Sequence, residues 1–215
     1  MKLYTYFRSS AAYRVRIALN LKGLPYESVP VHLVRGGGEQ HQAAYRAVNP
    51  AGLVPALVDD AGQVLTQSLA IIEYLEETHP TPALLPSGAL DRARVRALAQ
   101  AIACDTHPLN NTRVLQYLGK SLGADESARQ AWYRHWVAVG LGAVERLLAA
   151  DPKTGDFCHG DTPGLADCCL VPQVFNARRF DCDLSAMPMV ERIVANCERL
   201  PAFQAAAPAQ QPDAE

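Results

Sequence analysis

The chain has 215 residues and a formal net charge of -2 at pH 7, from 20 Lys and Arg against 22 Asp and Glu. This length allows one large domain or two small ones, and the balanced charge argues against nucleic-acid binding, which normally needs a basic surface. No apolar run approaches the ~18 residues of a membrane span, and the first residues lack a secretory signal. We therefore expect a soluble cytoplasmic protein that does not bind membranes.

The first 80 residues alternate between strand and helix patterns. The predicted strands are 3–7, 27–33, 55–58 and 64–65, and the predicted helices are about 11–21, 42–48 and 66–78. A helix that joins the first two strands predicts a right-handed parallel unit, and the turn at 59–62 predicts a closing antiparallel hairpin. This order is typical of a thioredoxin-like domain, which we assign to residues 1–80. Residues 35–38 are expected to form a flexible loop.

Strand patterns nearly vanish in the second half of the chain. Residues 81–90 are expected to be a linker, because Pro82 and Pro86 lie within them. Residues 91–215 are expected to form an all-helical domain, with helices at about 91–118, 126–150, from near 164, and at 188–199. The tail 205–215, rich in Ala, Gln and Pro, is expected to be frayed. The predicted fold class is therefore α/β followed by all-α.

All six cysteines lie in the second half, and none forms a Cys-x-x-Cys pair. Reduced, mostly buried thiols are the expected state. The sequence also lacks the motifs of zinc hydrolases, phosphate-binding loops and serine hydrolases. It therefore predicts no metal site.

The segment Arg8-Ser9-Ser10 follows the first predicted strand and opens a helix. A helix N-terminus presents free N–H groups and a partial positive charge, which favour a thiolate over a thiol. No cysteine lies in the first 103 residues, so such a thiolate would come from a ligand. The alternative is that Ser9 and Ser10 only cap the helix.

Two further segments could bind a peptide-like ligand. Pro55 precedes a predicted strand, and a cis bond there would turn the main chain of Val54 towards a bound peptide; the alternative is an ordinary trans proline. Gln67 and Ser68 open the last helix of the first half. Their N–H groups and hydroxyl could hold a carboxylate, or only cap the helix.

Polar side chains interrupt the helical half at two places. His107 and Asn111 are expected on one helix face near Arg113, with local distortion at Pro108. Arg178 and Arg179 suit carboxylates, because a guanidinium can bind them bidentately. For each of these arginines, and for Arg14 and Arg16 on the first helix, the alternative is a solvated surface charge.

Several segments, in this order, resemble the zeta class of glutathione transferases over residues 1 to about 204. They are Phe7-Arg8-Ser9-Ser10-Ala11-Ala12-Tyr13-Arg14-Val15-Arg16, Asn49-Pro50 with Val54-Pro55, Gln67-Ser68-Leu69-Ala70-Ile71-Ile72-Glu73-Tyr74-Leu75, Pro108-Leu109-Asn110-Asn111, and Leu165-Ala166-Asp167-Cys168-Cys169-Leu170-Val171-Pro172. The resemblance implies a thioredoxin-like domain before an all-helical domain (the glutathione transferase fold), a homodimer, and glutathione as cofactor.

The resemblance also implies roles for particular residues. It implies glutathione contacts at Ser9, Ser10, Gln40, Val54, Pro55, Gln67, Ser68, His107 and Asn111. Catalytic roles would fall on Ser9, Ser10, Arg8 and Arg179. A small dicarboxylate substrate would contact Arg8, His107, Asn111, Arg113, Arg178 and Arg179.

The sequence departs from the family pattern at four places. Ala11 stands where the family usually has cysteine, which favours Ser9 and the helix dipole as the thiolate activator. Gly164 replaces the Ser or Thr of a capping box, with Asp167 keeping the other half. Gly52-Leu53 replaces the usual Lys-Gln pair, so one glutathione carboxylate would be held differently. Arg113 takes a place that is often small and polar.

Zeta-class enzymes isomerise cis-enediones such as maleylacetoacetate, an intermediate of tyrosine and homogentisate catabolism. Four arginines, Arg8, Arg113, Arg178 and Arg179, favour the branch that converts maleylpyruvate to fumarylpyruvate in gentisate catabolism. The reason is that maleylpyruvate carries two nearby carboxylates. Maleylacetoacetate isomerisation, glutathione conjugation or dehalogenation of small α-halo acids, and a non-enzymatic glutathione-fold binding module are the alternatives.

Overall fold

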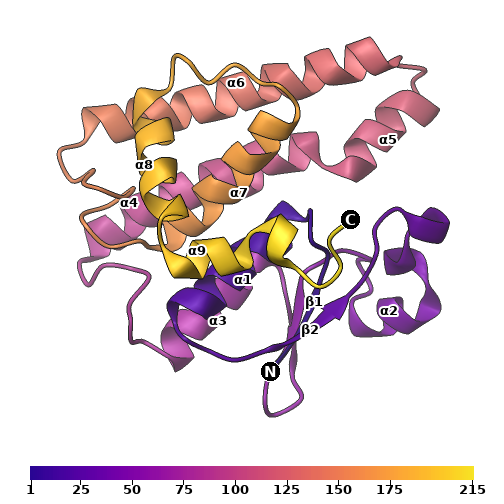
Figure 1. Ribbon diagram of the computed structural model, residues 1–215, viewed down its shortest axis with the longest axis horizontal. Coiled ribbons are helices and arrows are strands. Elements are labelled where there is room, and N and C mark those ends of the chain that lie inside the picture. The colour runs from indigo at the N-terminus through magenta and orange to yellow at the C-terminus, as the bar shows by residue number, and fades with distance from the viewer. The chain divides into compact units, whose positions relative to one another are not determined.

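The computed structural model describes all 215 residues (Figure 1). They form two compact units, one of residues 1–84 with 199–215 and one of residues 85–198. The sequence prediction placed 199–215 in the helical domain, and the structure places them with the first unit instead. No helix of the structure is both long and apolar enough to cross a bilayer.

The first unit contains a four-stranded sheet. Its strands are β1 (Lys2–Thr5), β2 (Glu27–Pro30), β3 (Ala56–Val58) and β4 (Val64–Thr66), in the order β2-β1-β3-β4. β1 and β2 are parallel, and the β1–β3 and β3–β4 pairs are antiparallel. The predicted parallel unit and closing hairpin are thus confirmed.

Helices cover both faces of this sheet. Successive side chains of β1 point in opposite directions, so that they contact helices on both faces. Thr5 Oγ1 accepts a hydrogen bond from Arg16 on α1 (Ser10–Leu21) at 3.0 Å. Tyr4 points the other way, its ring 5.7 Å from that of Tyr45 on α2 (Ala43–Val48). α1 packs against α3 (Ser68–Thr78), and the two lie on the opposite side of the sheet from α2 (Figure 1).

Short 3-10 turns replace the flexible loop predicted at 35–38. They are η1 (Arg35–Gly37) and η2 (Glu39–His41). Gly36, Gly37 and Gly38 all have positive φ angles, a conformation that glycine adopts without steric cost.

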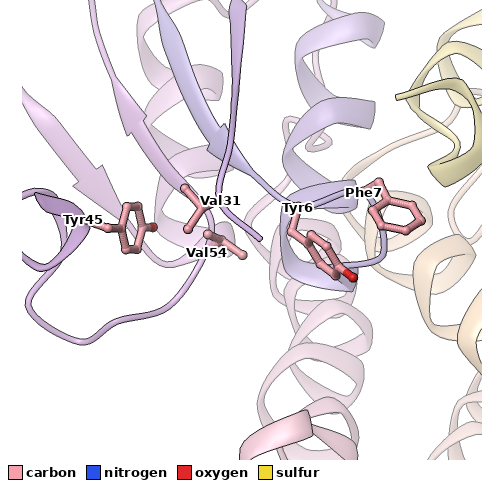
Figure 2. Packing of buried hydrophobic residues seen from close by; sticks show 5 residues of the cluster. All are labelled: Tyr6, Phe7, Val31, Tyr45 and Val54. Atoms are coloured by element: carbon pink, nitrogen blue, oxygen red, sulfur yellow. The ribbon is translucent and has the colours of Figure 1, made fainter. Parts of the chain in front are cut away.

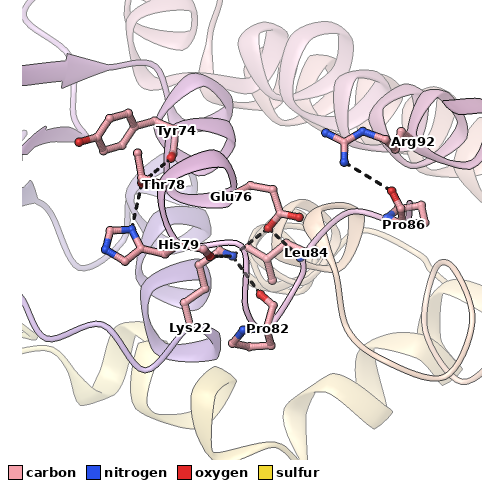
Figure 3. A network of polar contacts seen from close by, with 9 residues as sticks. All are labelled: Lys22, Tyr74, Glu76, Thr78, His79, Pro82, Leu84, Pro86 and Arg92. Atoms are coloured by element: carbon pink, nitrogen blue, oxygen red, sulfur yellow. Dashed lines mark hydrogen bonds and ion pairs between the residues drawn. The ribbon is translucent and has the colours of Figure 1, made fainter. Parts of the chain in front are cut away.

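A buried cation links the end of α1 to α3 and to the segment that follows α3 (Figure 3). Lys22 Nζ donates to Glu76 Oε2 at 2.8 Å and to the carbonyls of His79 and Pro82 at 2.7 and 2.9 Å. The same Glu76 oxygen accepts from the N–H of Leu84 at 2.9 Å. The Lys22 side chain is 0% exposed, so these partners take the place of water as its hydrogen-bond acceptors.

The tail that was expected to be frayed is ordered against α1. It contains α9 (Pro201–Ala206) and the 3-10 turn η5 (Pro208–Gln210). Asn20 Nδ2 donates to the carbonyl of Ala202 at 3.0 Å, and Arg16 Nε donates to that of Ala206 at 3.0 Å. Because buried donors on α1 satisfy the backbone of the tail, the frayed-terminus prediction is wrong.

The second unit is helical throughout. Its helices are α4 (Ala89–Gln100), the π-helix η3 (Ala101–Thr106), the 3-10 helix η4 (His107–Asn110), α5 (Thr112–Lys120), α6 (Glu126–Ala150), α7 (Leu165–Arg179) and α8 (Pro188–Glu198). The single helix predicted over 91–118 is therefore divided. Thr106 Oγ1 donates to the carbonyl of Ala101 at 2.8 Å, and Pro108 lacks the N–H that a regular helix needs.

The start of α7 is capped as the sequence suggested. The Asp167 carboxylate accepts from the N–H of Gly164 at 2.8 Å and from that of Cys158 at 2.9 Å. Asp167 is buried, and desolvation raises its pKa above the usual 3.8, against the opposing effect of these hydrogen bonds. Cys158, Cys168, Cys169 and Cys197 are buried free thiols, as expected.

Candidate functional site

The strand register brings three segments to one end of the sheet. Tyr4 of β1 pairs with Ala56 of β3, which pairs with Thr66 of β4. The chain leaves β1 towards Ser9, enters β3 from Pro55, and leaves β4 towards Ser68, all at this end. The N-termini of α1 and α3 therefore open next to each other, and each carries the partial positive charge of a helix start.

Ser9 is the N-cap of α1. Its N–H donates to the carbonyl of Tyr6 at 2.9 Å, and its Oγ accepts from the N–H of Ala12 at 3.2 Å. The capping interpretation is thus correct, but it does not use the hydroxyl proton, since Oγ acts as acceptor in that bond. Ser9 can cap the helix and donate to an anion together. Ser10 is buried in the first turn.

An apolar cluster supports the turn that leads to Ser9 (Figure 2). It consists of Tyr6, Phe7, Val31, Tyr45 and Val54. Arg8 is exposed, and its guanidinium carbon lies 4.7 Å from the centroid of the Phe7 ring. The cluster thus sets the position of the ring on which Arg8 rests.

The Val54–Pro55 bond is cis, which decides the question that the sequence left open. Two side chains hold the preceding loop, because Asn49 Nδ2 and the Tyr45 hydroxyl both donate to the carbonyl of Leu53, at 2.7 and 2.6 Å. The main-chain N–H and C=O of Val54 lie outside the hydrogen bonds of this loop. They are therefore available to pair with an extended ligand.

Gln40 lies in η2, beside the same loop. Its Nε2 donates to the carbonyl of Leu33 at 3.3 Å. A Cβ at Gly52 would lie 3.0 Å from the Gln40 carbonyl oxygen, and Gly52 has a φ of +62°. The glycine of the unusual Gly52-Leu53 pair thus allows the loop to approach η2 closely.

Gln67 and Ser68 form the entry to α3. Gln67 has a φ of 69°, unusual for a residue other than glycine, and its carbonyl accepts the first helical bond from Ile71 at 2.9 Å. Ser68 Oγ accepts from Arg14 Nη1 at 3.1 Å. Arg14 is only 2% exposed, so treating it as a solvated charge was wrong. Its place among the apolar residues of α1 in the sequence could have indicated this burial.

The polar residues around Pro108 are held differently from the prediction. His107 lies in η4, whereas Asn111 is extended and caps α5, its side chain accepting from the N–H of Arg113 at 3.1 Å. The two do not share a face of one helix, because the helix ends between them. Arg113 is exposed. Asn110, which the sequence did not single out, is 8% exposed, and its side-chain amide has no hydrogen-bond partner within the protein.

Arg178 and Arg179 are adjacent but engaged differently. Arg178 forms ion pairs with Glu191 and Glu198, both at 2.8 Å, which raise its pKa against the effect of burial. Arg179 Nη1 donates to Asn176 Oδ1 at 3.3 Å, and its guanidinium carbon lies 4.9 Å from the Phe180 ring centroid. The geometry of Arg178 is therefore that of a structural link between α7 and α8.

The structure places the predicted residues in two separate groups. The first unit holds Arg8, Ser9, Ser10, Gln40, Val54, Pro55, Gln67 and Ser68, and the second holds His107, Asn111, Arg113, Arg178 and Arg179. Within the first unit, the sheet register and the Arg14–Ser68 hydrogen bond bring the segments of Ser9, Val54 and Ser68 to one end of the sheet.

Comparison with known proteins agrees with this geometry. Residues 3–83 match the family model for the N-terminal domain of glutathione S-transferases. The chain is 57% identical to a maleylpyruvate isomerase from Ralstonia sp. over 214 residues, covering 99% of both chains. A solved holo structure of a maleylpyruvate isomerase, described as a bacterial zeta-class glutathione S-transferase, has a TM-score of 0.96, 56% identity and full coverage of both chains.

A third relative was solved with ligands. The maleylacetoacetate isomerase of Anaeromyxobacter dehalogenans 2CP-1, with dicarboxyethyl glutathione and citrate in its active site, has a TM-score of 0.87 and 44% identity, covering 100% of this chain and 97% of that one. The chain belongs to the zeta class of the glutathione S-transferases, with their fold.

Proposed function

We propose that this protein is a glutathione-dependent isomerase that converts the cis double bond of maleylpyruvate to the trans bond of fumarylpyruvate. The observation that carries the proposal is that two helix N-termini lie next to each other at one end of the sheet, and that Ser9 caps the first of them. Helix N-termini favour bound anions through their free N–H groups and partial positive charge. The likeness to maleylpyruvate isomerases over the whole chain supports the choice of reaction.

The polar groups of the first unit fit glutathione. Ser9 and the N-terminus of α1 would stabilise its thiolate, and with Ala11 in the third position no cysteine competes for that role. The available main chain of Val54 would pair with the cysteinyl residue. Gln67 and Ser68 would bind the γ-glutamyl carboxylate at the N-terminus of α3, with Arg14 supplying positive charge behind Ser68.

Bound glutathione would supply a thiolate that adds to the double bond and is eliminated after rotation about the resulting single bond, so glutathione is regenerated. The protein's part is to favour the thiolate and to hold the substrate. Arg8 would bind one carboxylate and stabilise charge that develops on the neighbouring carbonyl oxygen. The ligands in the Anaeromyxobacter relative, dicarboxyethyl glutathione and citrate, support a site for acidic groups.

Residues of the second unit would complete the recognition of substrate and cofactor. Arg113 and Arg179 would bind carboxylates, and His107 and Asn111 would orient glutathione or the substrate. Arg178 is left out of this assignment, because two glutamates already neutralise its charge.

The test is an assay of the purified chain with maleylpyruvate, with and without glutathione. We expect fumarylpyruvate only in the presence of glutathione and an unchanged glutathione concentration at the end. Consumption of glutathione with formation of a conjugate would instead identify a transferase or dehalogenase. Glutathione binding without turnover of any cis-enedione would identify a binding module.

Maleylacetoacetate is the second candidate substrate, because the Anaeromyxobacter relative is a maleylacetoacetate isomerase. The two substrates should be compared by kcat/KM in the same preparation. A higher kcat/KM for maleylacetoacetate would reverse the assignment.

We also propose that the protein acts as a homodimer in the cytoplasm. Six free cysteines suit a reducing compartment, which is also where glutathione is abundant. Light scattering after gel filtration tests the dimer, since a monomeric mass at assay concentrations would exclude it.

A further inference from the structure

The turn from Tyr6 to Ser9 is held by groups that approach its backbone from two elements. On one side, Arg16 of α1 donates from Nη2 to the carbonyl of Phe7 at 3.0 Å and from Nη1 to that of Tyr6 at 3.4 Å. On the other side, the N–H of Phe7 donates to Asp213 Oδ2 at 3.0 Å. Asp213 is separated from Phe7 by 206 positions in the sequence.

Phe7 therefore connects the tail to both groups that the proposed reaction needs. Its ring supports the Arg8 guanidinium, and its main chain lies two residues before Ser9. A shift of the Phe7 backbone would move Arg8 and Ser9 together. The N–H of Phe7 is thus a point at which the tail can control the geometry of the site.

The tail is built to present Asp213 at this point. Gln211 is buried, and its Nε2 donates to the carbonyls of Ala205 and Ala207, both at 2.9 Å. Glu215 pairs with Arg35 at 2.5 Å and lies 3.3 Å from His32 Nε2. Asp213 is held between these two anchors and beside a pocket whose lining includes His32, Arg35 and Glu39.

Asp213 also lies near the buried charge of Arg16. Burial lowers the pKa of Arg16 to about 10, and the Asp213 carboxylate is among the groups that oppose this shift. The Asp213 side-chain carboxylate and the Arg16 guanidinium, which carry opposite charges, thus hold the peptide unit between Tyr6 and Phe7. Asp213 accepts from its N–H, and Arg16 donates to its C=O and to the following carbonyl, that of Phe7.

We propose that Asp213 is a positioning residue, which fixes the Phe7 peptide and thereby the placement of Ser9 and Arg8. The proposal rests on the proposed function for the role of Ser9 but not for the hydrogen bond itself. It assigns a purpose to the ordered tail, which composition alone had suggested was frayed.

Three variants separate the hydrogen bond from the charge and from the anchoring of the tail. Asp213→Ala removes the acceptor, Asp213→Asn keeps an acceptor oxygen without the charge, and Glu215→Gln weakens only the terminal anchor. The first readout is the hydrogen exchange rate of the Phe7 amide in the ligand-free protein. The second is the pKa of bound glutathione, followed by the ultraviolet absorbance of its thiolate, together with kcat.

We expect Asp213→Ala to speed exchange at Phe7, to raise the thiol pKa of bound glutathione and to lower kcat about 3- to 10-fold, the effect of one lost hydrogen bond. Asp213→Asn should remain near the parent protein in all three, and Glu215→Gln, which weakens one anchor of the tail but keeps the acceptor at position 213, should change each readout less than Asp213→Ala does. Parent-like exchange, thiol pKa and kcat in Asp213→Ala would overturn the proposal. So would equal losses in the Ala and Asn variants, because the charge would then be responsible.

The experiment also separates this inference from the proposed function. If the parent protein binds no glutathione thiolate, the proposed function fails, while the exchange of the Phe7 amide still tests the contact with Asp213. If Asp213→Ala unfolds, the Asn variant and its exchange rate decide whether an acceptor at position 213 holds the turn.

Discussion

Arg14 Nη1 donates to Ser68 Oγ at 3.1 Å, linking the helix that Ser9 caps to the first residue of α3. The guanidinium is buried at 2% exposure and contributes a full positive charge beside a helix start that already favours anions. This contact gives the buried arginine a hydrogen-bond partner among the apolar residues of α1.

We predict that Arg14→Met weakens glutathione binding about 10-fold, because a charge-assisted hydrogen bond is lost. Ser68→Ala should weaken it as well, and the double variant should lose less than the sum, since the two side chains act as one unit. Titration calorimetry measures the dissociation constants. Strictly additive losses would show that the two side chains contribute independently.

The fold was predictable from the sequence to the extent that periodicity determines it. A short run of aromatic and β-branched residues indicated the first strand, and Gly23 after α1 indicated the end of that helix. Within the 91–118 segment, the distortion at Pro108 was predicted, but the π-helix before it was not, because Ile102 and Thr106 continue a helical pattern. The tail was missed because its contacts, made by backbone carbonyls and by the side chains of Asp213 and Glu215, are to residues far away in the sequence, which composition does not reveal.

The candidate site was predictable where a motif fixes both the residue type and its position at a helix start, as at Ser9 and Ser68. It was not predictable where neighbouring cations differ only in their partners. Arg178 and Arg179 are identical in the sequence pattern, yet only Arg178 faces Glu191 and Glu198. Asp213 could not be found either, because nothing in the sequence relates it to Phe7.

The dual role of Ser9 predicts that two substitutions will separate capping from catalysis. Ser9→Ala should cost about 1 kcal/mol of stability, whereas Ser9→Gly should cost only a few tenths. Both should lower turnover strongly, by about 10²-fold, because both remove the hydroxyl that donates to the thiolate. Urea unfolding and steady-state kinetics measure the two effects. A Gly variant with parent-like turnover would remove Ser9 from the mechanism.

The adjacent arginines provide a matched pair of variants. Arg179→Gln should raise the KM for the dicarboxylate about 10-fold, through loss of a charged hydrogen bond. Arg178→Gln should leave KM unchanged and cost at most about 1 kcal/mol of stability, because its ion pairs are partly exposed. Kinetics at varied substrate concentration distinguishes them. The reverse pattern would make Arg178 the substrate ligand.

Asp167 should give the second unit a pH-dependent stability of unusual sign. Burial raises its folded-state pKa above 3.8, so the folded protein binds the proton more tightly than the unfolded chain. The contribution of Asp167 is therefore greatest below about pH 4 and is lost as pH rises through the raised pKa. In urea unfolding, the stability of the parent protein minus that of Asp167→Asn should fall as the pH rises above about 4. A difference that rises with pH would mean that the two N–H donors outweigh burial.

The buried pair of Lys22 and Glu76 predicts a large effect away from the site. Lys22→Met should cost about 3–5 kcal/mol, because the Glu76 carboxylate is left buried without its cation. Lys22→Met with Glu76→Gln should recover part of this loss, since the neutral amide needs no counter-charge and its oxygen can still accept from the N–H of Leu84. Both variants should retain the parent affinity for glutathione where they are folded. A loss below about 1 kcal/mol in Lys22→Met would show that water reaches the carboxylate, as in an exposed ion pair.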